Sequence, residues 1–185
     1  MPDPPPPAPV PMPPPPSPPA TSLGARITQL AAEKPDAPAI TDATHTLTWR
    51  ELDRRTNRIA RGLAKAGVKA GDVVSIALPN TSAYLEAAFG LWKAGATPQM
   101  LSYRLPAHEA DAILELAEAP ILITDGSVES SHPSYSVEAL LALGEDDGPL
   151  EDVLSPCFKA ATSGGSTGRP KLIMSGSPGL AIATG

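Results

Sequence analysis

Apolar residues follow helical and strand-like spacings from Ser22 onward. A first helix is predicted between a Ser22 N-cap and the Lys34–Pro35 bond, because one helical face would carry Leu23, Ile27, Leu30 and Ala31. Short strands are expected at 39–41 and 45–49, on either side of a turn at 42–44. The first ordered part of the chain is thus expected to be one helix followed by two short strands.

From Thr48 onward the pattern predicts helices and strands in alternation. Thr48 and Glu51 have capping-box spacing at the start of a helix over about 49–66. Two more helices are indicated by apolar stripes, one with Leu85, Ala88, Phe89 and Trp92 and one with Ala110, Ile113, Leu114 and Ala117. A short helix is expected at 136–143.

Strands are predicted between these helices at 73–78, 97–101 and 121–124. The first and last are nearly continuous apolar runs, which are typical of strands covered on both faces. Strands separated by helices of this length favour parallel pairing through crossover connections. We therefore predict an α/β fold, with a parallel-rich sheet flanked by helices.

The N-terminal segment, residues 1–20, has a different composition. It holds 13 of the 24 prolines in the chain. Because each proline fixes its own φ and biases its predecessor away from helix, we expect a disordered, extended tail that packs against nothing. Docking of its PxxP spacings on an SH3-like groove is the alternative, but no Arg or Lys flanks them to orient such a ligand.

Charge and composition exclude several classes of function. The net charge of −6 would repel a phosphate backbone, so nucleic acid is not expected as a partner. No apolar stretch approaches the length of a membrane span, and no secretory signal is recognisable, so the expected location is the cytoplasm. The single cysteine, Cys157, is expected to be a buried structural thiol, with a reactive thiol as the alternative. The oligomeric state cannot be read from the sequence.

Other chemistry-bearing residues do not form a site by their spacing. The acidic run 145–147 is expected to be a solvated surface, since three adjacent carboxylates do not form a metal cage. His45, His108 and His132 are scattered without ligand spacing, so no metal site is predicted. Asp125 follows an apolar strand, where sites gather in parallel sheets, yet a structural role is favoured for it.

The segment 157–173, CFKAATSGGSTGRPKLI, carries the chemistry. A strand-like start leads into small and hydroxylated residues and then Lys171. Small residues let a backbone curl around an anion so that several N–H groups point inward, and hydroxyls add donors. The segment suits phosphate, although it is neither a Walker-type P-loop nor a GxGxxG fingerprint. A flexible Ser/Gly linker is the alternative from physical chemistry alone.

The motif GSTGRPK at 165–171 resembles the signature loop of the adenylate-forming superfamily, which includes acyl-CoA synthetases, luciferases and peptide-synthetase adenylation domains. The segment 47–98 is also similar to the N-terminal pattern of that superfamily. The resemblance implies that 21–185 is the N-terminal portion of an adenylation domain of the acid–CoA ligase type, truncated after its phosphate loop. It implies a phosphate-binding set of Ser163, Gly164, Gly165, Ser166, Thr167, Gly168 and Lys171.

The resemblance also implies a reaction. In the family a carboxylate attacks the α-phosphorus of Mg-ATP to give an acyl-adenylate, and a thiol then displaces AMP. Implied cofactors and co-substrates are ATP, Mg²⁺ and CoA, with a small-molecule carboxylate as the partner substrate. The Mg²⁺ ligand and the catalytic residues of the family lie downstream of this segment, so no catalytic residue is predicted here, and the isolated chain is expected to be inactive.

Two departures and two alternatives remain. Leu172 stands where the family usually has glycine, and SGSPG at 175–179 replaces a hydroxyl–His segment. The alternative from another class is a non-catalytic remnant or interaction module, which nucleotide binding would argue against. The alternative within the family is a peptide-synthetase adenylation domain with a carrier-protein thiol as acceptor.

Overall fold

The computed structural model describes residues 20–163 and 170–181. Within these residues the helices are α1 Leu23–Glu33, α2 Trp49–Lys65, α3 Ser82–Lys93, α4 Ala107–Leu116 and α5 Val137–Leu143. The strands are β1 Thr21–Ser22, β2 Pro38–Thr41, β3 Thr46–Thr48, β4 Val73–Ala77, β5 Thr97–Met100, β6 Leu122–Thr124, β7 Ser134–Tyr135, β8 Ala160–Ser163, β9 Lys171–Met174 and β10 Leu180–Ala181. The tail predicted at 1–20 lies outside the described residues except for Ala20.

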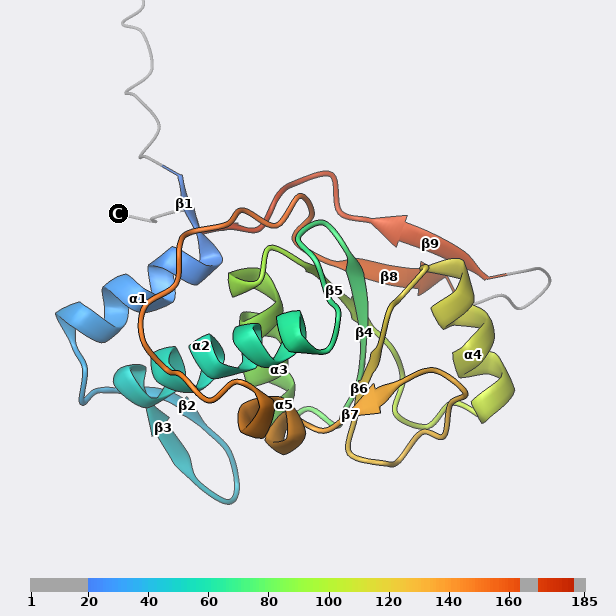
Figure 1. Cartoon of the computed structure of the whole chain (residues 1–185), viewed down its shortest axis with the longest axis horizontal. Helices are drawn as coiled ribbons and strands as arrows, with labels where there is room; N and C mark the ends of the chain where they lie inside the picture. Colours follow the sequence, from blue (N-terminus) through green and yellow to red (C-terminus); the bar gives the residue numbers. More distant parts are fainter. Residues whose placement is uncertain (1–19, 164–169, 182–185) are drawn as a thin grey trace, which may run out of the picture.

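A six-stranded sheet forms the centre of the fold, with the strand order β7-β6-β4-β5-β8-β9 (Figure 1). Neighbours from β7 to β8 pair in parallel, and β9 alone pairs antiparallel, with β8. This confirms the predicted α/β class with a parallel-rich sheet. The antiparallel strand β9 is an addition that the apolar pattern did not indicate.

Helices cover both faces of β4, as its sequence VVSIA requires (Figure 1). One face carries Val74 and Ile76 and packs against α2, α3 and α5. The opposite face carries Ala77, next to Leu122 of β6, and packs against α4. Burial on two faces therefore explains the continuous apolar run, in place of an alternating pattern.

The N-terminal elements α1, β2 and β3 pack against α2. Thr48 and Glu51 form the predicted capping box, in which each side chain bonds the backbone N–H of the other residue. The hydrogen bonds to Thr48 hold the pKa of the Glu51 carboxyl below its ordinary value. The antiparallel β2–β3 pair and α1 bury a smaller apolar cluster around Ile27, Leu47 and Leu52.

Helices α2, α3 and α5 pack at very short range. A Cβ added at Gly62 would lie 2.1 Å from the carbonyl oxygen of Leu140, and one added at Gly90 would lie 2.3 Å from Cγ2 of Ile59. No side chain fits at either position without moving a helix. These two glycines therefore set the distances between the helices that cover the sheet.

Candidate functional site

The predicted phosphate segment lies in an antiparallel hairpin made by β8 and β9. Ser163, the last residue of β8, pairs with Lys171, the first residue of β9. The structure thus brings together the two ends of the predicted site. The other predicted residues, Gly164, Gly165, Ser166, Thr167 and Gly168, lie outside the described residues.

Local chemistry explains where the two strands begin. Ala160 is fully buried and pairs with Gln99 of β5, which attaches β8 to the sheet. Pro170 cannot donate a ladder hydrogen bond, and β9 starts at the next residue, on the sheet edge where proline is tolerated. In this hairpin β8 is an inner strand of the sheet, and β9 is the edge strand paired with it.

Strand β8 ends on the side of the sheet where ligands bind in α/β folds. Because β4, β5, β6 and β8 are parallel, their carboxyl ends lie on the same side of the sheet. Ser163 ends β8 on this side, and Asp125 follows β6 there. The phosphate segment thus begins at the position that general α/β architecture favours for a ligand.

The two described site residues offer donors. Ser163 is half-buried and Lys171 is exposed. A hydroxyl and an ammonium on neighbouring strands can both donate to one anion. In the ranges 20–163 and 170–181 no carboxylate forms an ion pair with Lys171, so its charge is not neutralised by this part of the chain.

Contacts at the base of the hairpin were not indicated by the sequence. The indole Nε1 of Trp92 donates to the carbonyl of Phe158 at 2.9 Å, and the two rings stack with centroids 5.3 Å apart. The Cys157 Sγ lies within hydrogen-bonding distance of the carbonyls of Lys159 and Ser175, so its single proton is shared between them. Cys157 is 4% exposed, which confirms the predicted buried thiol. The spacing of Trp92 fitted a core position, and nothing in the pattern showed its partner.

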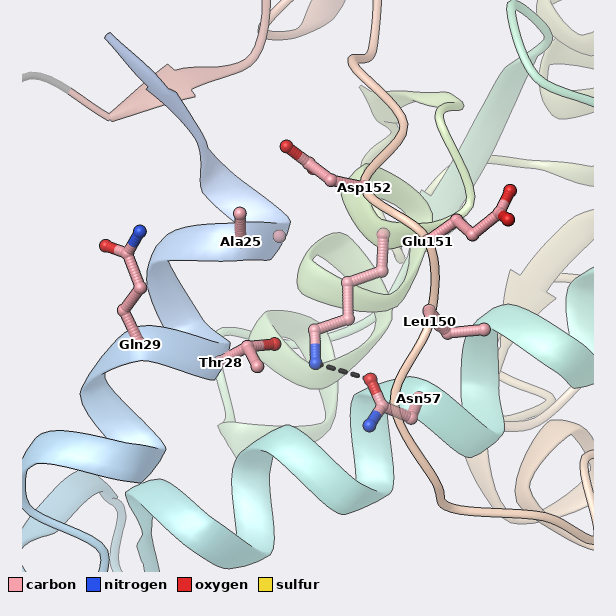
Figure 2. A pocket seen from close by; sticks show the side chains of 9 residues that line it. Ala25, Thr28, Gln29, Asn57, Leu150, Glu151 and Asp152 are labelled. Atoms are coloured by element: carbon pink, nitrogen blue, oxygen red, sulfur yellow. Dashed lines mark hydrogen bonds between the residues drawn. The ribbon is translucent and has the colours of Figure 1, made fainter. Parts of the chain in front are cut away.

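A separate pocket of about 230 Å³ lies where α1, α2 and α3 meet the segment 150–152 (Figure 2). Lys93 lines it and is almost completely buried, and its Nζ donates to Asn57 at 2.6 Å and to the carboxylate of Asp53 at 2.6 Å. A third bond reaches the carbonyl of Asp53 at 3.1 Å. Burial lowers the pKa of Lys93, although the bond to Asp53 opposes this. All three ammonium donors are used, so Lys93 joins helices and does not serve as a ligand site.

Asp42, His45 and Ser82 lie together and are the residue types of a hydrolase triad. However, the Ser82 hydroxyl donates to Asp42 at 2.7 Å and is 3.3 Å from the imidazole Nε2. Ser82 is only 4% exposed, and its backbone N–H also donates to Asp42. The Ser82 and Thr44 hydrogen bonds hold the pKa of Asp42 far below its ordinary value. Asp42 is therefore a cap for α3, whose N-cap residue Thr81 makes no side-chain cap bond.

The acidic run 145–147 is docked on α2. Glu145, Asp146 and Asp147 are 84%, 69% and 38% exposed at their side chains, and each forms an ion pair with a basic residue of α2. Arg61 also donates to the carbonyls of Asp146, Gly148 and Pro149. The prediction of an exposed acidic surface holds, but its docking was missed. The spacing of Arg54, Arg58 and Arg61 on one helical face was the available signal.

No helix in the described part of the chain has the length and apolarity needed to cross a membrane. Among residues 20–163 and 170–181 no group of three or more His, Cys, Asp or Glu side chains could hold a metal ion. Asp125 accepts a hydrogen bond from the backbone N–H of Ser127, and hydrogen bonding to Ser127 lowers its pKa. This contact stabilises the turn after β6.

Curated relatives match most of the chain. A feruloyl-CoA synthase of Amycolatopsis sp is 38% identical over 161 residues, which cover 80% of this chain and 32% of the relative. Pyochelin synthase PchD of Pseudomonas aeruginosa is 32% identical over 167 residues, which cover 77% of this chain and 30% of the relative. The chain therefore spans about a third of the length of these relatives.

Solved structures share the fold. An o-succinylbenzoate coenzyme A synthetase of Bacillus subtilis, in complex with AMP, superposes with a TM-score of 0.72 at 24% identity, covering 83% of this chain and 42% of that one. The N-terminal subdomain of NpsA from Klebsiella oxytoca gives a TM-score of 0.70 at 23% identity, covering 84% and 42%. The sequence model of the AMP-binding enzyme family matches residues 27–183. The chain therefore belongs to the AMP-binding enzyme family.

Proposed function

We propose that this protein uses ATP to activate a carboxylic acid and then transfers the acyl group to a thiol, with CoA as the acceptor. The observation that carries the proposal is the β8–β9 hairpin, which places Ser163 opposite Lys171 at the carboxyl edge of the sheet. Membership of the AMP-binding enzyme family supports it. We assign the reaction to the cytoplasm.

In this proposal the hairpin holds the β- and γ-phosphates of ATP. Ser163, Ser166 and Thr167 contribute hydroxyls, the glycines at 164, 165 and 168 contribute backbone N–H groups, and Lys171 contributes a positive charge. Hydrogen bonds to a charged group contribute about 1.5–3 kcal/mol each, so three or four can hold a triphosphate against its hydration. Mg²⁺ would neutralise phosphate charge.

The proposed reaction has two steps. A carboxylate oxygen attacks the α-phosphorus of ATP, the bond from that phosphorus to the β-bridging oxygen breaks, and pyrophosphate leaves. A thiolate sulfur then attacks the acyl carbon, and AMP leaves with the oxygen that joined the acyl group to phosphorus. The hairpin positions the leaving group and stabilises its charge in the first step, and it transfers no proton.

The curated relatives suggest which substrates to try first. The feruloyl-CoA synthase suggests ferulate and other aromatic acids, with CoA as the acceptor. Because the chain spans about a third of that relative, we propose that the 185 residues alone bind nucleotide without turnover. The assay therefore needs the protein at the length it has in its own cells.

Exchange of labelled pyrophosphate into ATP tests the activation step. The protein purified from its source would be supplied with ATP, Mg²⁺ and one acid at a time from an aromatic and aliphatic panel. Carboxylate-dependent exchange is the expected result, because only the adenylate step releases pyrophosphate reversibly. Release of ADP and inorganic phosphate from ATP, without any exchange, would contradict adenylate formation.

A peptide-synthetase adenylation domain is the second candidate, and the pyochelin synthase relative favours it. In that case a carrier-protein thiol would accept the acyl group, and free CoA would not release AMP. A non-catalytic remnant is the remaining possibility, and it predicts neither exchange nor nucleotide binding.

A further inference from the structure

The side chains of β9 fix its register on β8 only weakly. Lys171 is exposed, and Ile173 and Met174 are 55% and 44% exposed, so only Leu172 is partly covered. Register is strongly specified only where one face of a strand is buried. A slip of one residue would move Lys171 by about 3.3 Å and turn its side chain to the other face of the sheet.

Further contacts join the two chains at the base of the hairpin. The backbone hydrogen bonds continue before β8 and after β9. Ser175 N–H donates to the Lys159 carbonyl at 2.9 Å, and Phe158 N–H donates to the Ser177 carbonyl at 2.8 Å. The Cys157 Sγ lies 3.2 Å from the Lys159 carbonyl oxygen and 3.0 Å from the Ser175 carbonyl oxygen, and its single proton can be donated to either. This one buried side chain therefore contacts the chain entering the hairpin and the chain leaving it.

Trp92 connects this base to the helical core. Its Nε1 donates to the Phe158 carbonyl at 2.9 Å, and its ring stacks on the Phe158 ring with an interplanar angle of 12°. Phe89, one turn earlier in α3, contacts Trp92 edge-on at 5.3 Å. The indole therefore relates the chain entering β8 to a rigid helix.

We propose that Trp92 and Cys157 are positioning residues for Lys171: they fix the β8–β9 register and thereby hold Lys171 opposite Ser163. The proposal rests on the proposed function, since it concerns how the same site binds phosphate. It adds residues outside the loop signature, from α3 and from the segment before β8. Both act through Lys171 and need not touch the nucleotide.

Binding of Mg-ATP to the 185-residue chain, measured by calorimetry, tests the proposal. Trp92→Phe keeps a stacked ring and removes the indole donor, and we expect about three- to tenfold weaker binding, the effect of one hydrogen bond. Trp49→Phe, the other tryptophan of the chain, is the matched control and should change affinity less than about twofold.

A double-mutant cycle separates positioning from general destabilisation. In the Lys171→Ala background the effect of Trp92→Phe should shrink to less than about twofold, because there is no lysine left to misplace. The Cys157 pair gives a second readout, in which Cys157→Ser retains a donor and binding while Cys157→Ala weakens it. If Trp92→Phe does not fold, the two Cys157 variants test the positioning role in its place.

Amide hydrogen exchange reports the stability of the hairpin whether or not the chain binds nucleotide. It therefore tests the positioning role separately from the proposed function. Amides of the peptide 158–177 should exchange faster in Trp92→Phe than in Trp49→Phe, with or without nucleotide. Faster exchange in a chain that binds no Mg-ATP would support the positioning role and contradict the phosphate site. Unchanged exchange, or an equal loss of affinity in both Lys171 backgrounds, would overturn the positioning role.

Discussion

Replacement of the buried Lys93 by methionine is expected to destabilise the chain by about 3 kcal/mol. The Lys93 side chain is 3% exposed and that of Asp53 is 15% exposed, with Nζ 2.6 Å from the carboxylate. Removing one member of a buried pair costs about 3–5 kcal/mol because the other charge stays buried. Asp53 keeps a hydrogen bond from the Thr28 hydroxyl at 2.7 Å, which places the loss at the lower end.

Urea unfolding of the 185-residue chain measures this loss. With a slope of about 1–3 kcal/mol per molar urea, the midpoint should fall by about 1–3 M. Lys65→Met is the matched control, because Lys65 and Glu145 pair at 3.6 Å with side chains 53% and 84% exposed. Its effect should stay within about 0.5 kcal/mol.

A second variant tests the physical reason for the loss. Asp53→Asn in the Lys93→Met background removes the stranded charge and should restore part of the lost stability. Equal losses for Lys93→Met and Lys65→Met would contradict this explanation, since burial would then not decide the cost of breaking an ion pair. A further loss from Asp53→Asn would refute it as well.

Two further predictions concern packing and pH. Gly62→Ala should destabilise by about 1–3 kcal/mol, because the new methyl group would meet the Leu140 carbonyl, whereas Gly176→Ala, with open space around it, should be nearly neutral in the same urea assay. Asp42→Ala should lower the melting temperature at pH 7, because the carboxylate accepts bonds from Ser82, and this penalty should shrink below about pH 4. The sign follows from the lowered folded-state pKa of Asp42, whose stabilisation is present above the unfolded pKa and is lost as pH falls toward the folded one. A penalty that grows on acidification would contradict this.

The fold could be predicted because its signals are local. The apolar run at 73–77 and the Thr48–Glu51 capping box depend on neighbours in sequence, and both formed as expected. Strand β9 gave no such signal, since three of its four side chains are exposed and it is defined only by its partner. Periodicity reports burial, so an edge strand with exposed side chains is invisible to it.

The candidate site could be predicted from its loop residues. The tertiary contacts around it could not. A hydroxyl-rich loop ending in lysine is a chemical signal that lies within one stretch of sequence. The contact between Trp92 and Phe158 joins residues 66 positions apart, and the contact between Asp42 and Ser82 joins residues 40 apart. Such pairs depend on the tertiary fold, and a single sequence does not show them.

Binding of Mg-ATP to wild type and to Lys171→Ala tests whether the β8–β9 hairpin holds the phosphates of ATP. Lys171 supplies the charge expected to meet the phosphates, so its removal should weaken binding by about tenfold or more, the effect of one charged hydrogen bond. Lys159→Ala, an exposed lysine on the same hairpin, should leave affinity within about twofold. An affinity that Lys171→Ala leaves unchanged, or a wild-type chain that binds no Mg-ATP, would contradict the assignment of this hairpin as the phosphate site.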